Sequence, residues 1–142
     1  MGRCYYRQLG KKEVGKYGQP KWVFNFKKDY SENYKVFSLE TREYSDEVKG
    51  VISLVDLYDG YYGVRIKDVE SAEWNKSFIK GLEHKGKNVN CKYTEVGTNL
   101  VAFACQYSIL KGLNGFVQLK SKTTTIKFYQ EIGFELFDPV NA

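Results

Sequence analysis

The stretch 96–134 most constrains the fold, because it combines one helical pattern, one strand pattern and strong turn signals. Between residues 99 and 111, apolar side chains recur at helical spacing along one side. Gly112 and the Asn114–Gly115 pair end this helix, because glycine adopts left-handed backbone angles at little cost. The short apolar segment Phe116–Leu119 then predicts a buried strand. The order predicts a helix packed on a sheet.

A second, shorter helix closes this stretch. The hydroxyls of residues 123–125, all threonine, are suited to cap a helix start. Ile126, Tyr129 and Ile132 follow at helical spacing and share one face, and Gly133 is the stop signal.

Three strand candidates lie upstream, at residues 34–42, 49–57 and 61–73. Asp59–Gly60 is a hairpin signal between the second and third of them. A strand meander followed by helix, strand and helix predicts an α+β fold. Its sheet is mixed but mostly antiparallel and is flanked by helices.

Side chains alternate between the two faces of a strand. In the third candidate this places Val64, Ile66, Glu70 and Ala72 on one face. Val69, Ser71 and Glu73 take the other face, and only a bulge would move Glu73 to the first.

The length of 142 residues fits one domain, which we expect to span residues 21–142. Residues 1–20 are basic, rich in glycine and without a clear period, and they predict an irregular segment. Trp22, Phe24 and Phe26 alternate with other residues and indicate either an edge strand or a hydrophobic anchor. Only about thirty residues precede the first hairpin, so we expect an abbreviated N-terminal region.

Composition narrows the class of protein. The apolar fraction of 42% and charged fraction of 27% are typical of a globular protein, and no run approaches the ~18 apolar residues of a membrane span. The N-terminus lacks the apolar core of a secretory signal, and the three cysteines form no close pair, so we expect a cytoplasmic protein without disulfides.

His84 is the only histidine and has no metal-ligand spacing around it, so we expect no metal site. The modest net charge of +5 favours a solvated basic surface, or attraction of an anionic ligand, over nucleic-acid binding.

Four segments together resemble the GCN5-related N-acetyltransferase (GNAT) superfamily. Residues 128–134, FYQEIGF, match the family's F-Y-x-x-x-G-F ending, and residues 97–101 match the second glycine of its loop and the start of its main helix. Residues 70–75 are similar to the E-S-A-P-x-N segment of an uncharacterised bacterial subgroup, and residues 22–26 to its W-x-F-D-W motif. The resemblance covers about residues 22–137.

The resemblance implies acetyl-CoA as a cosubstrate, bound where the fourth and fifth strands separate. It implies strand backbone that pairs with pantetheine and a loop and helix start that bind pyrophosphate. The helix contact agrees with the positive end of the helix dipole. The cofactor-binding residues implied are Val69, Ser71, Lys92, Val96, Gly97, Thr98, Asn99 and Lys122.

The resemblance also implies catalytic groups. Glu70 is the candidate base and Glu73 the second choice, and Tyr129 is the candidate proton donor to the CoA thiolate. The alternatives are a core tyrosine and solvated carboxylates.

The function implied is acetyl transfer from acetyl-CoA to an amine by direct attack, with an acceptor that the sequence does not identify. The alternative is a GNAT-fold binding or regulatory module with weak or no catalysis. Glu95 in place of the first glycine of the loop, Lys122 in place of an asparagine, and the short N-terminal region motivate it. A basic nucleic-acid-binding domain is a third reading. Residues 135–137 are a candidate strand for a homodimer.

Overall fold

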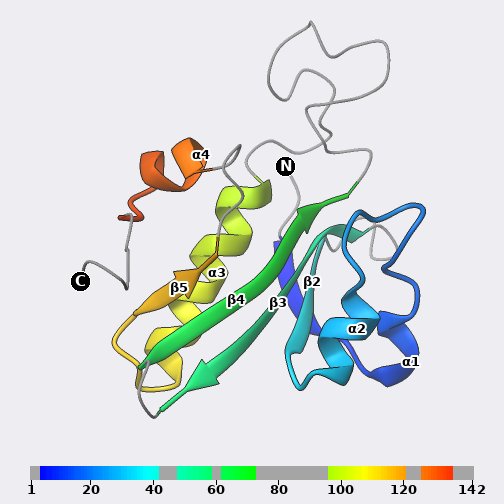
Figure 1. The fold of residues 1–142 in the computed structure, drawn as a ribbon, viewed down its shortest axis with the longest axis horizontal. Helices are drawn as coiled ribbons and strands as arrows, with labels where there is room; N and C mark the ends of the chain where they lie inside the picture. The colour runs from blue at the N-terminus through cyan, green and yellow to red at the C-terminus, as the bar shows by residue number, and fades with distance from the viewer. Residues whose placement is uncertain (1–3, 42–47, 59–61, 73–95, 121–125, 136–142) are drawn as a thin grey trace, which may run out of the picture.

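The computed structural model describes residues 4–41, 48–58, 62–72, 96–120 and 126–135. Its elements, in chain order, are β1 (Cys4–Gln8), α1 (Lys11–Val14), α2 (Phe26–Ser31), β2 (Lys35–Thr41), β3 (Val48–Leu57), β4 (Gly63–Ser71), α3 (Val96–Leu110), β5 (Val117–Leu119) and α4 (Ile126–Glu131). Figure 1 shows their arrangement. No helix within these ranges is both long and apolar enough to span a membrane.

The strands form one sheet in the order β1-β2-β3-β4-β5. The first three pairings are antiparallel, whereas β4 and β5 are parallel. A parallel pair needs a crossover connection, and α3 lies in that connection. The predicted α+β fold with a mixed, mostly antiparallel sheet is confirmed.

Each face of the sheet has its own apolar core. One core lies between the sheet and α3, and its buried members include Phe37, Leu39, Ile52, Leu54, Val64, Ile66, Leu100, Ala104 and Tyr107. The other lies under α1 and α2, and it contains Leu9, Val14, Trp22, Phe26, Val36, Val48, Val51 and Ala72. In Figure 1, α2 lies in front of the sheet and α3 behind it.

The N-terminal segment is ordered where the sequence predicts an irregular one. Residues 4–8 form β1, which pairs with β2, and residues 11–14 form α1. The ring of Tyr6 stacks on that of Phe103 in α3, with centroids 4.1 Å apart. The glycines in this region separate short elements. The long-range contacts that stabilise β1 leave no local period to detect.

Residues 22–26 form the hydrophobic anchor and not the edge strand. Trp22 is 2% exposed and Phe26 is fully buried, and their rings meet edge to face at 6.2 Å. Phe26 begins α2, whose start is capped by Asn25. The side-chain oxygen of Asn25 accepts a hydrogen bond from the Lys28 amide at 3.1 Å.

A bulge in β4 changes the predicted faces. Ser53 of β3 lies opposite Asp68, but the next residue, Leu54, lies opposite Ile66. Lys67 is therefore an extra residue, and the alternation reverses beyond it. Val64 and Ile66 face α3, whereas Ala72 belongs to the core under α1 and α2. The prediction that Val64 and Ile66 share a face with Glu70 and Ala72 is wrong for this reason.

Candidate functional site

The parallel pairing of β4 with β5 is short. It runs from Val64 opposite Val117 to Ile66 opposite Leu119, whereas β4 continues to Ser71. Among the described residues, β5 contributes no partner to the second half of β4. β5 ends opposite Ile66, whereas β4 continues past this point, as Figure 1 shows.

The second half of β4 directs backbone groups toward the side on which β5 has ended. The Ala72 amide donates to the Lys49 carbonyl of β3 at 2.8 Å. Ser71 lies opposite Gly50 in the adjacent pair, which makes it a pair without ladder hydrogen bonds. The N–H and C=O groups of Ser71, and by the same alternation those of Val69, point away from β3. Both residues therefore face the side on which β5 has ended.

The first turn of α3 lies close to the same part of the sheet. Gly50, opposite Ser71, has no side chain, and a Cβ there would lie 2.9 Å from Val96 Cγ1 and 3.0 Å from the Glu70 carbonyl oxygen. This glycine lets the helix approach the sheet closely. Gly97, Thr98 and Asn99 complete the first turn, where N–H groups lack partners within the helix and the dipole is positive.

Glu70 anchors the segment that precedes α2. Its side chain is 6% exposed, and its two oxygens accept hydrogen bonds from the Val23 and Phe24 amides, each at 3.0 Å. It lies opposite Val51, a member of the core under α1 and α2. The structure thus gives Glu70 a clear structural role, and its role as a base stays a prediction.

The structure also contains a pair of aspartates near Glu70 that the sequence did not predict. Asp29 of α2 is 3% exposed, and its Oδ2 accepts a hydrogen bond from Ser53 Oγ at 2.7 Å. Ser53 Oγ in turn accepts one from the Asp68 amide at 3.0 Å. Ser53 thus links Asp29 of α2 to Asp68 of β4, and the proximity of Asp29 raises the pKa of Asp68. No motif or spacing links the two positions, and the β4 bulge that brings them together is not visible in the sequence.

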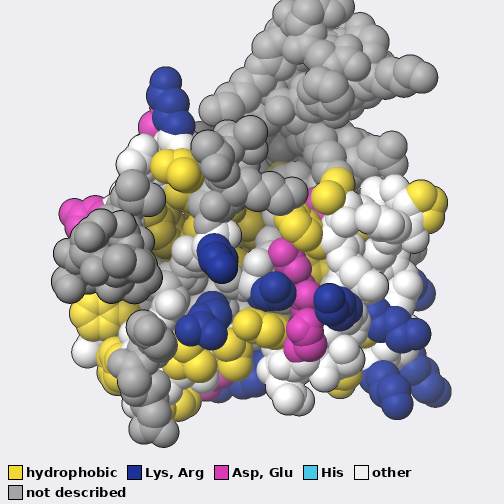
Figure 2. Space-filling model, viewed as in Figure 1, with side chains coloured by type: hydrophobic (Ala, Val, Ile, Leu, Met, Phe, Trp, Pro, Cys, Tyr) yellow, Lys and Arg dark blue, Asp and Glu magenta, His cyan; other side chains and the backbone are white. Residues whose placement is uncertain are grey.

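The electrostatics of this pair are unusual for aspartate. Burial is the largest cause that raises the pKa of Asp68, to about 7, followed by its hydrogen bond to Asp29 and the charges of Asp29 and Glu70. Lys67 acts in the opposite direction. Figure 2 shows acidic side chains grouped over the middle of this face, with Lys and Arg side chains around them.

Tyr129 of α4 lies near this pair. Its ring packs edge to face on that of Phe134, with centroids 5.7 Å apart, and the residue is partly buried. Burial raises the pKa of the Tyr129 hydroxyl, and the charge of Asp68 raises it further. The tyrosine therefore stays protonated at neutral pH.

The remaining predicted site residues divide into two groups. Val96, Gly97, Thr98 and Asn99 form the first turn of α3, and Val69 and Ser71 lie on β4. Glu73, Lys92 and Lys122 lie outside the described residues, as does Glu95.

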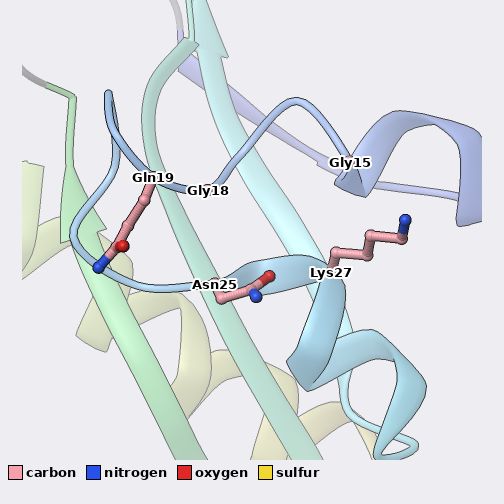
Figure 3. Close-up of a pocket in the computed structure, with 5 residues that line it drawn as sticks. All are labelled: Gly15, Gly18, Gln19, Asn25 and Lys27. Carbon is pink, nitrogen blue, oxygen red and sulfur yellow. The ribbon is translucent and has the colours of Figure 1, made fainter.

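A separate hollow of about 360 Å³ lies between α1 and the start of α2. Gly15, Gly18, Gln19, Asn25 and Lys27 line it (Figure 3). It contains none of the residues that the sequence assigns to a site. The side chain of Asn25 is already engaged as the cap of α2.

Three solved structures are similar to this chain. A GNAT-family acetyltransferase from Streptococcus pneumoniae aligns with a TM-score of 0.57 and 19% identity, over 96% of this chain and 89% of that one. A predicted acetyltransferase from Clostridium acetobutylicum, with acetyl-CoA, aligns with a TM-score of 0.53 and 10% identity over 96% and 93%. A Bacillus subtilis acetyltransferase in complex with CoA aligns with a TM-score of 0.57 and 16% identity over 97% and 79%.

No protein-family model matches the sequence, and no curated protein does. At such low identities the structural likeness shows the fold. The chain has the GNAT fold, and the resemblance found in the sequence is confirmed at this level. The bacterial subgroup stays a prediction.

Proposed function

We propose that this chain, which has the GNAT fold, binds acetyl-CoA between β4 and β5 and transfers its acetyl group to an amine. The observation that carries the proposal is that β4 continues past the end of its pairing with β5. β4 extends beyond its pairing with β5, and Val69 and Ser71 turn their backbone groups into the space that this leaves. A parallel strand or an extended ligand is the natural partner for such groups.

Two of the similar structures support acetyl-CoA as the ligand. The Clostridium protein is described with acetyl-CoA, and the Bacillus subtilis protein is in complex with CoA. In this chain, the amides of Val69 and Ser71 would pair with the pantetheine arm. The first turn of α3, with Val96, Gly97 and Thr98, would hold the pyrophosphate.

Further cofactor contacts remain proposals from the sequence. Asn99 ends the proposed anion-binding turn, and its carbonyl already accepts a hydrogen bond from the Tyr6 hydroxyl at 2.6 Å. Lys92 and Lys122 are proposed to reach phosphate groups. When bound, acetyl-CoA supplies an activated acetyl thioester, and the chain's own residues must orient it and move protons.

Groups on β4 and α4 are the proposed proton donor and base of the reaction. Tyr129 is the proposed donor to the leaving sulfur, because burial and the charge of Asp68 keep its hydroxyl protonated. Glu70 and Glu73 are the carboxylates that the sequence favours for the base. Both oxygens of Glu70 already accept backbone hydrogen bonds, so acting as a base would require one of these bonds to open.

Amide NMR tests where acetyl-CoA binds. In a titration of the ¹⁵N-labelled protein, we expect the largest shift changes at Val69, Ser71, Gly97 and Thr98. Largest changes at Gly15 and Gly18 would instead place the ligand in the hollow between α1 and α2 and refute the proposed site. Free CoA is the control. It should affect the α3 signals as acetyl-CoA does, because the pyrophosphate is common to both.

The alternative of a binding or regulatory module makes a different prediction. It expects the same shift changes on addition of acetyl-CoA, but no release of CoA above the uncatalysed rate with any amine. Release of CoA that depends on an added amine would exclude it.

A further inference from the structure

Asp29 and Asp68 form a pair of neighbouring aspartates in which Asp68 has a raised pKa. Asp29 is almost completely buried. Its carboxylate accepts a hydrogen bond from the Ser53 hydroxyl, which fixes the orientation of the carboxylate. The backbone amide of Asp68 donates to the same hydroxyl, so one serine contacts both residues. Neighbouring carboxylates do not both ionise readily, and burial together with Asp29 favours the protonated form of Asp68.

The two members of the pair are not equivalent. Asp29, on α2, is almost completely buried, whereas Asp68 is partly exposed and lies nearer Tyr129. A proton that enters or leaves the pair from the outside therefore does so at Asp68. Asp29 receives the hydrogen bond from protonated Asp68 and so stabilises that form.

We propose that Asp68 is the proton acceptor for the attacking amine and that Asp29 is the residue that positions it. This inference rests on the proposed acetyltransferase function and deepens it. The acceptor that fits is a cationic primary amine, because Asp29, Asp68 and Glu70 concentrate negative charge at this point of the sheet. An ammonium is attracted there and loses its proton there.

Protons and electrons balance through these groups. The ammonium gives one proton to the Asp68 carboxylate, and the freed nitrogen lone pair forms the C–N bond to the acetyl carbon. The C–S bond breaks with its electron pair on sulfur. The sulfur takes a proton from Tyr129, which regains one from the newly acylated nitrogen. Asp68 then releases its proton to solvent, so each turnover yields the acetylated amine, the free thiol and one proton.

The charges around Asp68 set the pH at which it acts. These charges are Lys67 and Glu70 on β4 and Asp29 on α2, whereas the titratable hydroxyl of Tyr129 on α4 is neutral. Burial and the acidic neighbours raise the pKa of Asp68 to about 7, whereas Lys67 lowers it. A base is active only when deprotonated, so kcat/KM should rise with pH through about 7.

The first test is NMR titration of the aspartate side chains in protein labelled with ¹³C at the carboxyl carbon. We expect one resonance of the wild type to titrate near pH 7. In Asp68→Asn this high titration should disappear. Asp56→Asn, on β3 and outside the pair, is the control and should retain it. If every aspartate of the wild type titrates below pH 5, the pKa of Asp68 is not raised and the proposal is wrong.

The second test is the release of CoA from acetyl-CoA with spermidine, tyramine and a lysine-containing peptide as amines. Asp68→Asn should lower kcat/KM by roughly 100-fold, with acetyl-CoA affinity unchanged. Asp29→Asn should move the inflection of the pH profile toward acid by about one unit or more, because it removes a neighbouring negative charge. A residue with only a structural role would not move that inflection. Asp56→Asn should leave rate and profile as in the wild type.

Stability gives an independent readout. Because the folded pKa of Asp68 lies above the unfolded value of about 4, folding favours the protonated form. Its stabilising effect is complete below about pH 4 and is lost as the pH rises to about 7. Asp68→Asn should therefore melt at a higher temperature than the wild type at pH 8, but not at pH 4. Equal melting temperatures of Asp68→Asn and the wild type at pH 8 would contradict a raised pKa of Asp68 in the folded protein.

The outcomes separate this inference from the proposed function. If acetyl-CoA binds and CoA is released, but Asp68→Asn reacts as fast as the wild type, only the assignment of Asp68 fails. If acetyl-CoA does not bind, or bound acetyl-CoA releases no CoA with any of the three amines, the catalytic assignment of Asp68 fails together with the acetyltransferase function.

Discussion

Tyr129→Phe is expected to lower kcat/KM for CoA release by roughly 100-fold, the usual effect of losing a general acid. The substitution removes only the hydroxyl and keeps the ring that packs on Phe134. Burial and the charge of Asp68 raise the pKa of that hydroxyl, so it carries its proton throughout the neutral range. The affinity for acetyl-CoA should change less than about twofold, because a proton donated only at the transition state contributes little to ground-state binding.

The matched control is Tyr58→Phe. The Tyr58 hydroxyl donates to Asp56 Oδ2 at 2.9 Å, and the side chain is 56% exposed. Its loss should leave kcat/KM within about twofold of the wild type. If Tyr129→Phe reacts as fast as Tyr58→Phe, then Tyr129 is a core tyrosine, and the thiolate leaves without its help.

Glu70→Ala is expected to destabilise the protein by about 3 kcal/mol, because it leaves the Val23 and Phe24 amides without their acceptor. For a chain of this size the melting temperature should fall by roughly 10 °C. The segment that Glu70 holds carries Trp22 into the core under α1 and α2. Circular dichroism melting curves measure the change, and Glu32→Ala, at an exposed position after α2, should leave the curve nearly unchanged.

Glu70→Gln separates anchoring from catalysis. The amide keeps one acceptor oxygen but presents N–H groups where the second oxygen stood, so we expect part of the loss in stability. If Asp68 accepts the proton, kcat/KM per folded molecule should stay within about threefold. A loss of roughly 100-fold in the folded variant would make Glu70 the base, as the sequence suggests.

The central elements were predictable because they have strong local patterns. The helix between residues 99 and 111 has an apolar stripe and glycine stops, and β3 is a nearly continuous apolar run. These patterns predict α3, β2, β3, β4, β5 and α4 with ends close to those observed. β1, α1 and α2 were missed because elements of four to six residues owe their existence to partners far along the chain.

The site was predictable only in part. The positions of Val69, Ser71 and the first turn of α3 follow from strand alternation and from the glycine that opens the helix. The acid pair does not, because Asp29 meets Asp68 only through α2 and the extra residue Lys67 in β4. Period-two reasoning counts every residue of a strand, so a bulge reverses its result for all residues that follow.

The acid pair also illustrates a conflict between stability and activity. Asp68 lies against Asp29 at a cost in folding free energy above neutral pH, since like charges repel. Active sites commonly retain groups of this kind because their function needs a shifted pKa.

Calorimetric titration with acetyl-CoA tests the central claim most directly, and Ser71→Pro makes the test specific to the proposed site. Proline removes the Ser71 N–H, which faces away from β3, so the sheet should keep its ladder bonds and the fold should survive. We expect saturable binding in the micromolar range by the wild type, similar binding of free CoA, and little binding by the folded variant. No binding of acetyl-CoA by the wild type at millimolar concentration, or equal binding by Ser71→Pro, would contradict a cofactor site between β4 and β5.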